Sequence, residues 1–201
     1  MEDRINSFPP FIDKDSKILI LGSVPGVKSL EMQQYYAHPQ NHFWKIMFHL
    51  LAEPVTSDYE EKLAMLQRSG IAVWDTIESC VRKGSKDTDI KNEEANDIAK
   101  LLKEFPNIKA VFCNGQKAFK NLSKQFKNKE VGINFYGLPS TSPLHTVGLE
   151  KNLRNGNRFF IICKFWSFIC EFKPFKPYRC AKSIRFLEFL LLVFSIFKIK
   201  Y

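Results

Sequence analysis

Short apolar runs alternate along the chain with longer segments whose apolar residues recur at helical spacing. The runs occupy residues 17–21, 71–74, 110–113 and 132–136. Each is short enough for a strand and is bounded by Gly, Asn or Asp. Continuous apolar runs of this length are typical of strands buried on both faces of a parallel sheet.

Three segments between these runs have the features of helices. Residues 43–52 are rich in apolar and aromatic side chains, and residues 116–126 follow an Asn-Gly turn. In the segment ending at Phe105, apolar residues recur at helical spacing, with Glu93 and Glu94 expected at its start and Pro106 closing it. Alternating strands and helices predict an α/β fold with three layers, α/β/α, around a central, mainly parallel four-stranded sheet.

Ligands of such sheets bind beyond the carboxyl ends of the strands. The loops at 22–44 and 138–146 both follow predicted strands. We therefore expect the two loops to meet at one edge of the sheet.

The last part of the chain differs in composition from the rest and carries most of the net positive charge. Of the net charge of +9, residues 159–201 carry +6, from eight Lys and Arg against two Glu. Ten of the 19 Phe also follow residue 154. We therefore expect a domain at 1–153 and an atypical Phe- and Lys-rich tail at 154–201, and we give little weight to bulk charge as evidence for nucleic acid.

Three interpretations of the tail compete: a helix that completes the fold, an interfacial anchor, or translated out-of-frame sequence. We favour the third because the composition changes abruptly. The apolar stretch 186–197 is too short to span a bilayer, which needs roughly 20 residues. Five cysteines without a CxxC pair and a start without an export signal predict reduced thiols and a cytoplasmic location. We also expect a monomer. The scattered His residues predict no metal site and no cofactor.

Two loops carry the candidate chemistry. The first contains GSVPG at 22–26 and YYAHPQNHFW at 35–44. It offers aromatic faces and amide groups, which recognition of an extruded base requires. The second, LPSTSPLH at 138–145, offers hydroxyls and backbone amides for phosphates and an apolar wedge, Leu144. The alternative for each loop is an ordinary structural role, with aromatic and apolar residues packed on the domain.

Taken together, these loops resemble the uracil-DNA glycosylase superfamily over residues 15–153. AHPQNHFWK at 37–45 is similar to a segment of the mismatch-specific uracil-DNA glycosylases, and LPSTSP at 138–143 with His145 to one of the hypoxanthine-DNA glycosylases. A block at 74–90, containing Trp74, Arg82 and Asp87, also resembles the latter group. The resemblance implies a uracil-DNA glycosylase-like fold and metal-independent hydrolysis of an N-glycosidic bond in double-stranded DNA, as the first step of base excision repair.

One departure narrows the expected base. The mismatch-specific enzymes have an Asn in the middle of the GINPG loop that positions the water, and this chain has Val24 there. The resemblance to the hypoxanthine group implies Asn41 as the catalytic residue instead, and the Asn41 amide suits water or a purine edge. The main expectation is therefore a deoxyinosine glycosylase. A uracil or thymine mismatch glycosylase and a catalytically silent nucleic-acid-binding domain are the alternatives.

The remaining expected contacts fall into two sets. The base-binding set is Ser23, Tyr36, His38 and Phe43. The DNA-binding set is Gly22, Gly26, Ser140, Thr141, Ser142, Leu144 and His145. A purely structural role is the alternative for His38 and His145. Asp75 is expected to cap or orient a loop, and Asp87 to pair with Arg82.

Overall fold

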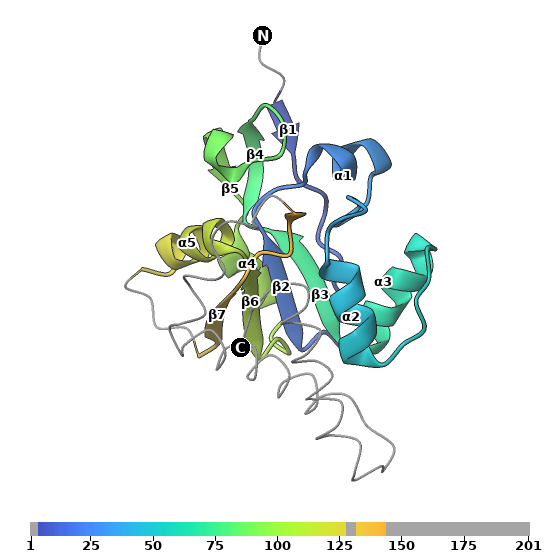
Figure 1. The fold of residues 1–201 in the computed structure, drawn as a ribbon. Helices are drawn as coiled ribbons and strands as arrows, with labels where there is room; N and C mark the ends of the chain where they lie inside the picture. Colours follow the sequence, from blue (N-terminus) through green and yellow to red (C-terminus); the bar gives the residue numbers. More distant parts are fainter. Residues whose placement is uncertain (1–3, 128–131, 144–201) are drawn as a thin grey trace, which may run out of the picture.

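The computed structural model describes residues 4–127 and 132–143. Its larger sheet has four parallel strands in the order β3-β2-β6-β7, which lie side by side in Figure 1. The strands are β2 (Ile18–Gly22), β3 (Ile71–Asp75), β6 (Ala110–Asn114) and β7 (Asn134–Leu138). The four predicted strands therefore belong to one parallel sheet, as predicted, although β7 begins and ends two residues later than the predicted run at 132–136.

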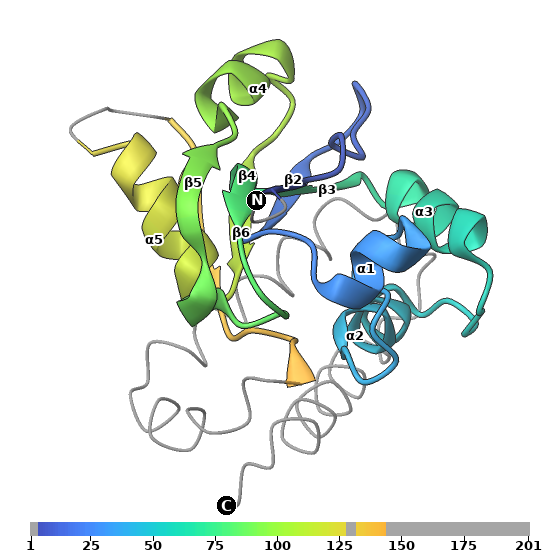
Figure 2. The ribbon, with the colours of Figure 1, turned by 90° about the horizontal axis from the view of Figure 1, so that it is seen from above.

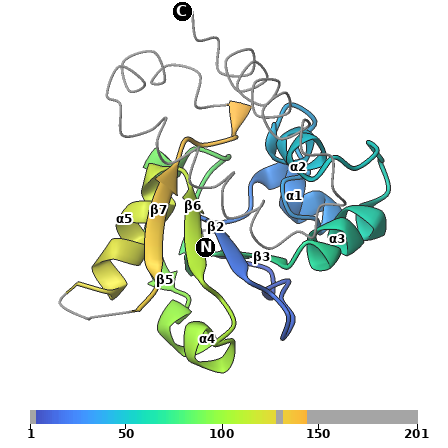
Figure 3. The same cartoon turned by 90° about the horizontal axis from the view of Figure 1, so that it is seen from below.

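Helices cover both faces of this sheet and complete the three layers (Figures 2 and 3). One face carries α2 (Phe43–Leu51) and α3 (Tyr59–Arg68), with the short α1 (Val27–Met32) beside them. The other carries α4 (Ile98–Glu104) and α5 (Gln116–Gln125). The expected helices at 43–52 and 116–126 are confirmed.

Each strand supplies side chains to both cores because successive residues of a strand point to opposite faces. In β2, Ile18 and Ile20 belong to the core beneath α2 and α3, whereas Leu19 and Leu21 belong to the core beneath α4 and α5. All four are at most 1% exposed. Burial on both faces explains why β2 reads as a continuous apolar run.

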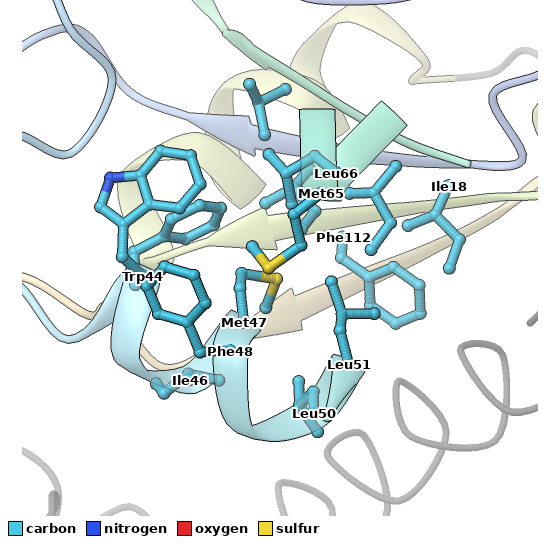
Figure 4. Close-up of a cluster of buried hydrophobic side chains, with 14 of the residues drawn as sticks. Ile18, Trp44, Ile46, Met47, Phe48, Leu50, Leu51, Met65, Leu66 and Phe112 are labelled. Atoms are coloured by element: carbon cyan, nitrogen blue, oxygen red, sulfur yellow. The ribbon is translucent and has the colours of Figure 1, made fainter. Parts of the chain in front are cut away.

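The core beneath α2 also fixes the loop that precedes this helix. Met47, Phe48 and Leu51 of α2 pack with β-strand and α3 side chains in the cluster of Figure 4. Trp44 lies in the same cluster, and its Nε1 donates to the Tyr35 carbonyl oxygen at 3.0 Å. The segment at 35–44, the aromatic loop, is thus attached to the buried helix α2.

A second, antiparallel sheet was not predicted. It contains β1 (Arg4–Asn6), β4 (Ile77–Val81) and β5 (Lys91–Ala95) in the order β1-β4-β5, and a 3₁₀ turn at Asp87–Asp89 precedes β5. All five β5 residues are exposed. Such a strand has no alternating apolar pattern, and its pairing partner comes from elsewhere in the chain.

The expected start of the 93–105 helix was wrong. Glu93 and Glu94 lie in β5, where Glu93 pairs with Lys117 and Glu94 with Arg4. The helix begins at Ile98, after the Asp97 side chain accepts a hydrogen bond from the Lys100 amide at 2.9 Å. This cap satisfies an amide that a helix leaves unpaired at its first turn, and it sets the boundary.

Cys80 and Cys113 are both buried and both are free thiols, in keeping with the expected reduced state. The tail at 154–201, with its three cysteines, and the residues Leu144 and His145 lie outside the described residues. None of the helices within residues 4–127 and 132–143 is long and apolar enough to cross a membrane.

We expect Leu21→Ala to destabilise the protein by about 2–5 kcal/mol, because the truncated side chain leaves a cavity in the core beneath α4 and α5. Urea unfolding followed by circular dichroism measures the change. Val55→Ala is the control, since Val55 is 82% exposed. Equal stability losses in the two variants would contradict this assignment of the core.

Candidate active site

The carboxyl ends of the parallel strands bring four residues to one edge of the sheet. Gly22 at the end of β2 lies opposite Asp75 at the end of β3. Asn114 at the end of β6 lies opposite Leu138 at the end of β7. Both candidate loops leave the sheet at this edge.

The two loops meet there, as predicted. The His42 amide donates to the Thr141 carbonyl oxygen at 3.1 Å. The Asn114 side chain makes two hydrogen bonds with Thr141, each of 2.9 Å. Asn114 Nδ2 donates to the Thr141 hydroxyl, and the Thr141 amide donates to Asn114 Oδ1. Next to it, the Ser142 amide donates to the Ser140 hydroxyl at 3.2 Å. Asn114 is thus a residue of the site whose positioning role the sequence did not indicate.

The turn after Asn114 allows this contact. Gly115 has a φ of +109°, which L residues with side chains rarely adopt. A Cβ on Gly115 would also lie 3.2 Å from the Ser140 Cβ. The glycine therefore lets α5 begin directly beside the second loop.

Asn41 lies where the first loop enters α2. Its Oδ1 accepts a hydrogen bond from the Phe43 amide at 3.0 Å, and its own amide donates to the His38 carbonyl oxygen at 2.8 Å. The Nδ2 group makes no hydrogen bond to another residue of the described chain, so it is the part of the side chain left for a ligand. An NH₂ group is a donor only.

Tyr36 and Phe43 stack on each other, with ring centroids 3.8 Å apart and an interplanar angle of 18°. Phe43 is 2% exposed, so its ring supports Tyr36 and offers little surface of its own. Tyr36 is only partly buried and has a φ of +54°. Of the two aromatic candidates, Tyr36 is the one with accessible surface. His38 is exposed, and its Nδ1 accepts from the Gln40 amide at 3.2 Å.

The 22–26 loop is fixed through its backbone carbonyl groups. The Gly22 oxygen accepts from the Thr76 amide at 2.9 Å and from the Thr76 hydroxyl at 3.1 Å. The Ser23 oxygen accepts from the Ile77 amide at 3.0 Å, and the Pro25 oxygen from Nη2 of Arg82. The loop is therefore attached to the chain leading into and out of β4.

Two more side chains of this segment reach the loop. Asp87 accepts from the Ser23 hydroxyl at 2.8 Å, and the Ser85 hydroxyl accepts from the Val27 amide at 3.1 Å. Asp87 lies within electrostatic reach of Arg82, but its hydrogen bond goes to Ser23. The segment at 74–90 thus positions the 22–26 loop, a role that its sequence did not specify.

Val24 points away from this edge. It is 7% exposed and packs with Ile77 and Cys80 in a small apolar cluster against the antiparallel sheet. An apolar side chain in this place anchors the loop and has no group that can orient water.

Asp75 is a second residue of the site that sequence reasoning valued too little. It is 4% exposed, and its Oδ2 has no hydrogen-bond partner in the described part of the chain. Burial raises the pKa of this carboxyl from 3.8 to about 7, with a further rise from Asp87 and an opposing effect from Arg82. A carboxylic acid directly after a buried strand was the only signal in the sequence. Among the described residues no three His, Cys, Asp or Glu side chains gather into a metal-binding group.

Comparison with known families agrees with this geometry. Residues 9–160 match the profile of the family described as Uracil DNA glycosylase superfamily. A solution NMR structure of a protein from Methanosarcina acetivorans, whose name places it with the uracil DNA glycosylases, is similar with a TM-score of 0.63 and 31% identity. The similarity covers 82% of this chain and 98% of that one.

Two relatives carry the name hypoxanthine DNA glycosylase. The protein from Methanosarcina barkeri is 43% identical over 112 residues, and the protein from Methanosarcina acetivorans is 39% identical over 112 residues. Each match covers 55% of this chain and 71% of the relative.

We expect Gly22→Ala to destabilise the protein by about 1–3 kcal/mol, because the new Cβ would lie 2.3 Å from Asp75 Oδ1 and force buried groups apart. Chemical denaturation measures the loss. Gly132→Ala is the matched control, since among the described residues no atom beyond its chain neighbours lies within 4 Å of its Cβ position. Two variants of equal stability would show that Asp75 is not packed against Gly22.

We expect Asp75→Asn to be more stable than the wild type at pH 8, with a gain that shrinks toward pH 5. The folded pKa of about 7 exceeds the ordinary 3.8. Below pH 3.8 the Asp75 carboxyl is protonated in both the folded and the unfolded state, and it does not lower the free energy of unfolding. As the pH rises from 3.8 to about 7, the unfolded state loses this proton first, and the free energy of unfolding falls by on the order of a few kcal/mol. Urea unfolding across this range measures the gain. Asp58→Asn, at an exposed position, is the control. A pH-independent gain at Asp75 would contradict the raised pKa.

Proposed function

The chain belongs to the uracil DNA glycosylase superfamily, and from that membership and the geometry of the sheet edge we propose that it removes hypoxanthine from deoxyinosine in DNA. The product is an abasic site, and the reaction is the hydrolysis of the N-glycosidic bond. The names of the two Methanosarcina relatives support this choice of base.

The placement of Asn41 is the observation that carries the proposal. The Phe43 amide occupies its Oδ1, which leaves Nδ2 as a donor at the edge where both loops meet. Hypoxanthine presents acceptors, O6 and N7, on one edge, and it gains negative charge as the glycosidic bond breaks. A donor fixed at this edge stabilises the leaving base more in the transition state than in the ground state.

The other groups of the edge bind and orient the substrate. The accessible part of the Tyr36 ring, backed by the buried Phe43 ring, is a platform on which an extruded base can stack. In the loop at 140–142 the Thr141 and Ser142 amides already donate within the protein, whereas the Ser140 hydroxyl accepts from the Ser142 amide and keeps its own proton as a donor for a phosphate. The 22–26 loop, held by Arg82, supplies fixed dipoles near the sugar. Val24 supports hypoxanthine over uracil because it removes the water-orienting group that the mismatch-specific enzymes have in this loop.

The proposal assigns the glycosylase to residues 1–153 and gives the tail at 154–201 no part in the reaction. The partner is double-stranded DNA containing a deaminated base, bound by a monomer in the cytoplasm.

The test uses the full chain with duplexes that contain inosine, uracil or xanthine, followed by alkaline strand scission. We expect cleavage at inosine alone, and a loss of about 10²–10³ in kcat for Asn41→Ala, as for removal of one transition-state donor. Asn107→Ala, an exposed residue whose Nδ2 donates to the Lys14 carbonyl oxygen, is the control and should keep full activity.

Asn41→Asp separates catalysis from structure. A carboxylate still accepts from the Phe43 amide, so the start of α2 keeps its hydrogen bond, but the donor is gone. We expect wild-type stability with a loss of activity as large as that of Asn41→Ala. Full activity in either variant contradicts the assignment of Asn41. Uracil release favours a mismatch glycosylase, and DNA binding without any cleavage favours a silent domain.

A further inference from the structure

Two buried oxygen atoms converge on Gly22. A Cβ at this position would lie 2.3 Å from Asp75 Oδ1 and 3.5 Å from the Tyr36 hydroxyl. In the described part of the chain, neither Asp75 Oδ2 nor the Tyr36 hydroxyl has a hydrogen-bond partner. Buried polar atoms without partners are rare because each has lost its water. The Asp75 carboxyl group and the Tyr36 hydroxyl thus lie beside the same residue without a side chain, Gly22, and each has an oxygen atom that lacks a partner among the described residues.

The chemistry of the two groups decides which one donates. Burial, followed by the charge of Asp75, raises the pKa of Tyr36, so the phenol keeps its proton at every working pH. Asp75 changes from acid to carboxylate near pH 7, and its carboxylate is an acceptor only. The Asn114 side chain, which has a second amide N–H besides the one it gives to Thr141, lowers the pKa of Tyr36. A donor to the phenol oxygen leaves the phenol proton for an acceptor.

The groups that face Asp75 come from every element packed around it. Arg82 follows β4 and favours the carboxylate, whereas Asp87 in the 3₁₀ turn opposes it. Tyr35 and Tyr36 face it from the aromatic loop, and burial raises the pKa of both. Asp75 is therefore the member of this group whose charge changes around neutrality.

We propose that Asp75 is a positioning residue: its carboxylate accepts a hydrogen bond from the Tyr36 hydroxyl across Gly22 and thereby fixes the Tyr36 ring as the platform for the base. The proposed contact rests on the packing at Gly22 and on the two oxygen atoms without partners in the described chain, and its effect on base excision rests on the proposed function. Gly22 has a defined part in this arrangement, since any side chain there would separate the two groups. Excision should then be fastest when Asp75 is charged, because a charge-assisted hydrogen bond holds the ring more firmly than a neutral one.

The contact is tested without reference to activity by following the Asp75 carboxyl carbon in an NMR pH titration of the full chain. In Tyr36→Phe the carboxylate loses its donor, so we expect the midpoint to move up by about one pH unit, the shift that corresponds to one such hydrogen bond. Tyr35→Phe is the matched control, because the Tyr35 hydroxyl donates to the Pro9 carbonyl oxygen at 3.1 Å and should leave the midpoint in place. An unchanged midpoint in Tyr36→Phe overturns the proposal.

The consequence for excision is tested by the pH profile of kcat on inosine-containing duplex. We expect the wild-type rate to rise through about pH 7, following the pKa of Asp75. Asp75→Asn mimics the protonated acid, so its profile should lack this rise and lie about tenfold below the wild type at pH 8, with equal rates near pH 5. Asp58→Asn should keep the wild-type profile.

The outcomes separate the two hypotheses. If the wild type releases no hypoxanthine, the proposed function fails, while the NMR titration still decides whether Asp75 and Tyr36 pair. If the wild type releases hypoxanthine and Asp75→Asn keeps the wild-type profile, the positioning role fails and the proposed function stands.

Discussion

The parallel pairing of β2 with β3 and β6 is the constraint on which the site depends. Parallel strands in register end together, so the last residue of each strand has a neighbour at the same edge. This places Gly22 against Asp75 and brings Asn114 beneath the second loop. The two buried cores hold that register, because a slip of one residue would exchange the side chains of the two faces.

The edge contains polar groups that a core optimised for stability would exclude. Asp75 and Arg82 are both largely buried. Burial raises the pKa of Asp75 and lowers the pKa of Arg82, which in each case favours the neutral form. Arg82 donates to the Pro25 carbonyl oxygen and so holds the first loop, while Asp75 has an oxygen without a partner. Buried polar atoms without partners and groups with perturbed pKa values are found most often at functional sites, where they lower the stability of the fold.

The small antiparallel sheet and the chain around it fix the conformation of the 22–26 loop. Three carbonyl oxygens of the 22–26 loop accept hydrogen bonds from the chain around β4, and Val24 packs into the cluster behind them. A loop held in this way presents its amides in a fixed direction and needs no side chain of its own at position 24. Under the proposed function, selection of the base then depends on Asn41 and Tyr36 in the aromatic loop.

The sequence by itself determined the four parallel strands, helices α2 and α5, and the meeting of the two loops, because continuous apolar runs and helical periodicity report burial directly. It placed Glu93 and Glu94 in a helix, and it missed β1, β4 and β5, because an exposed strand such as β5 has no apolar pattern and depends on a distant partner. Only the tertiary structure decided which side chains act together. The contacts of Asp75 with Gly22, of Asn114 with Thr141 and of Arg82 with Pro25 join residues far apart in the chain. No local pattern encodes such distances, and the packing of the two sheets sets them.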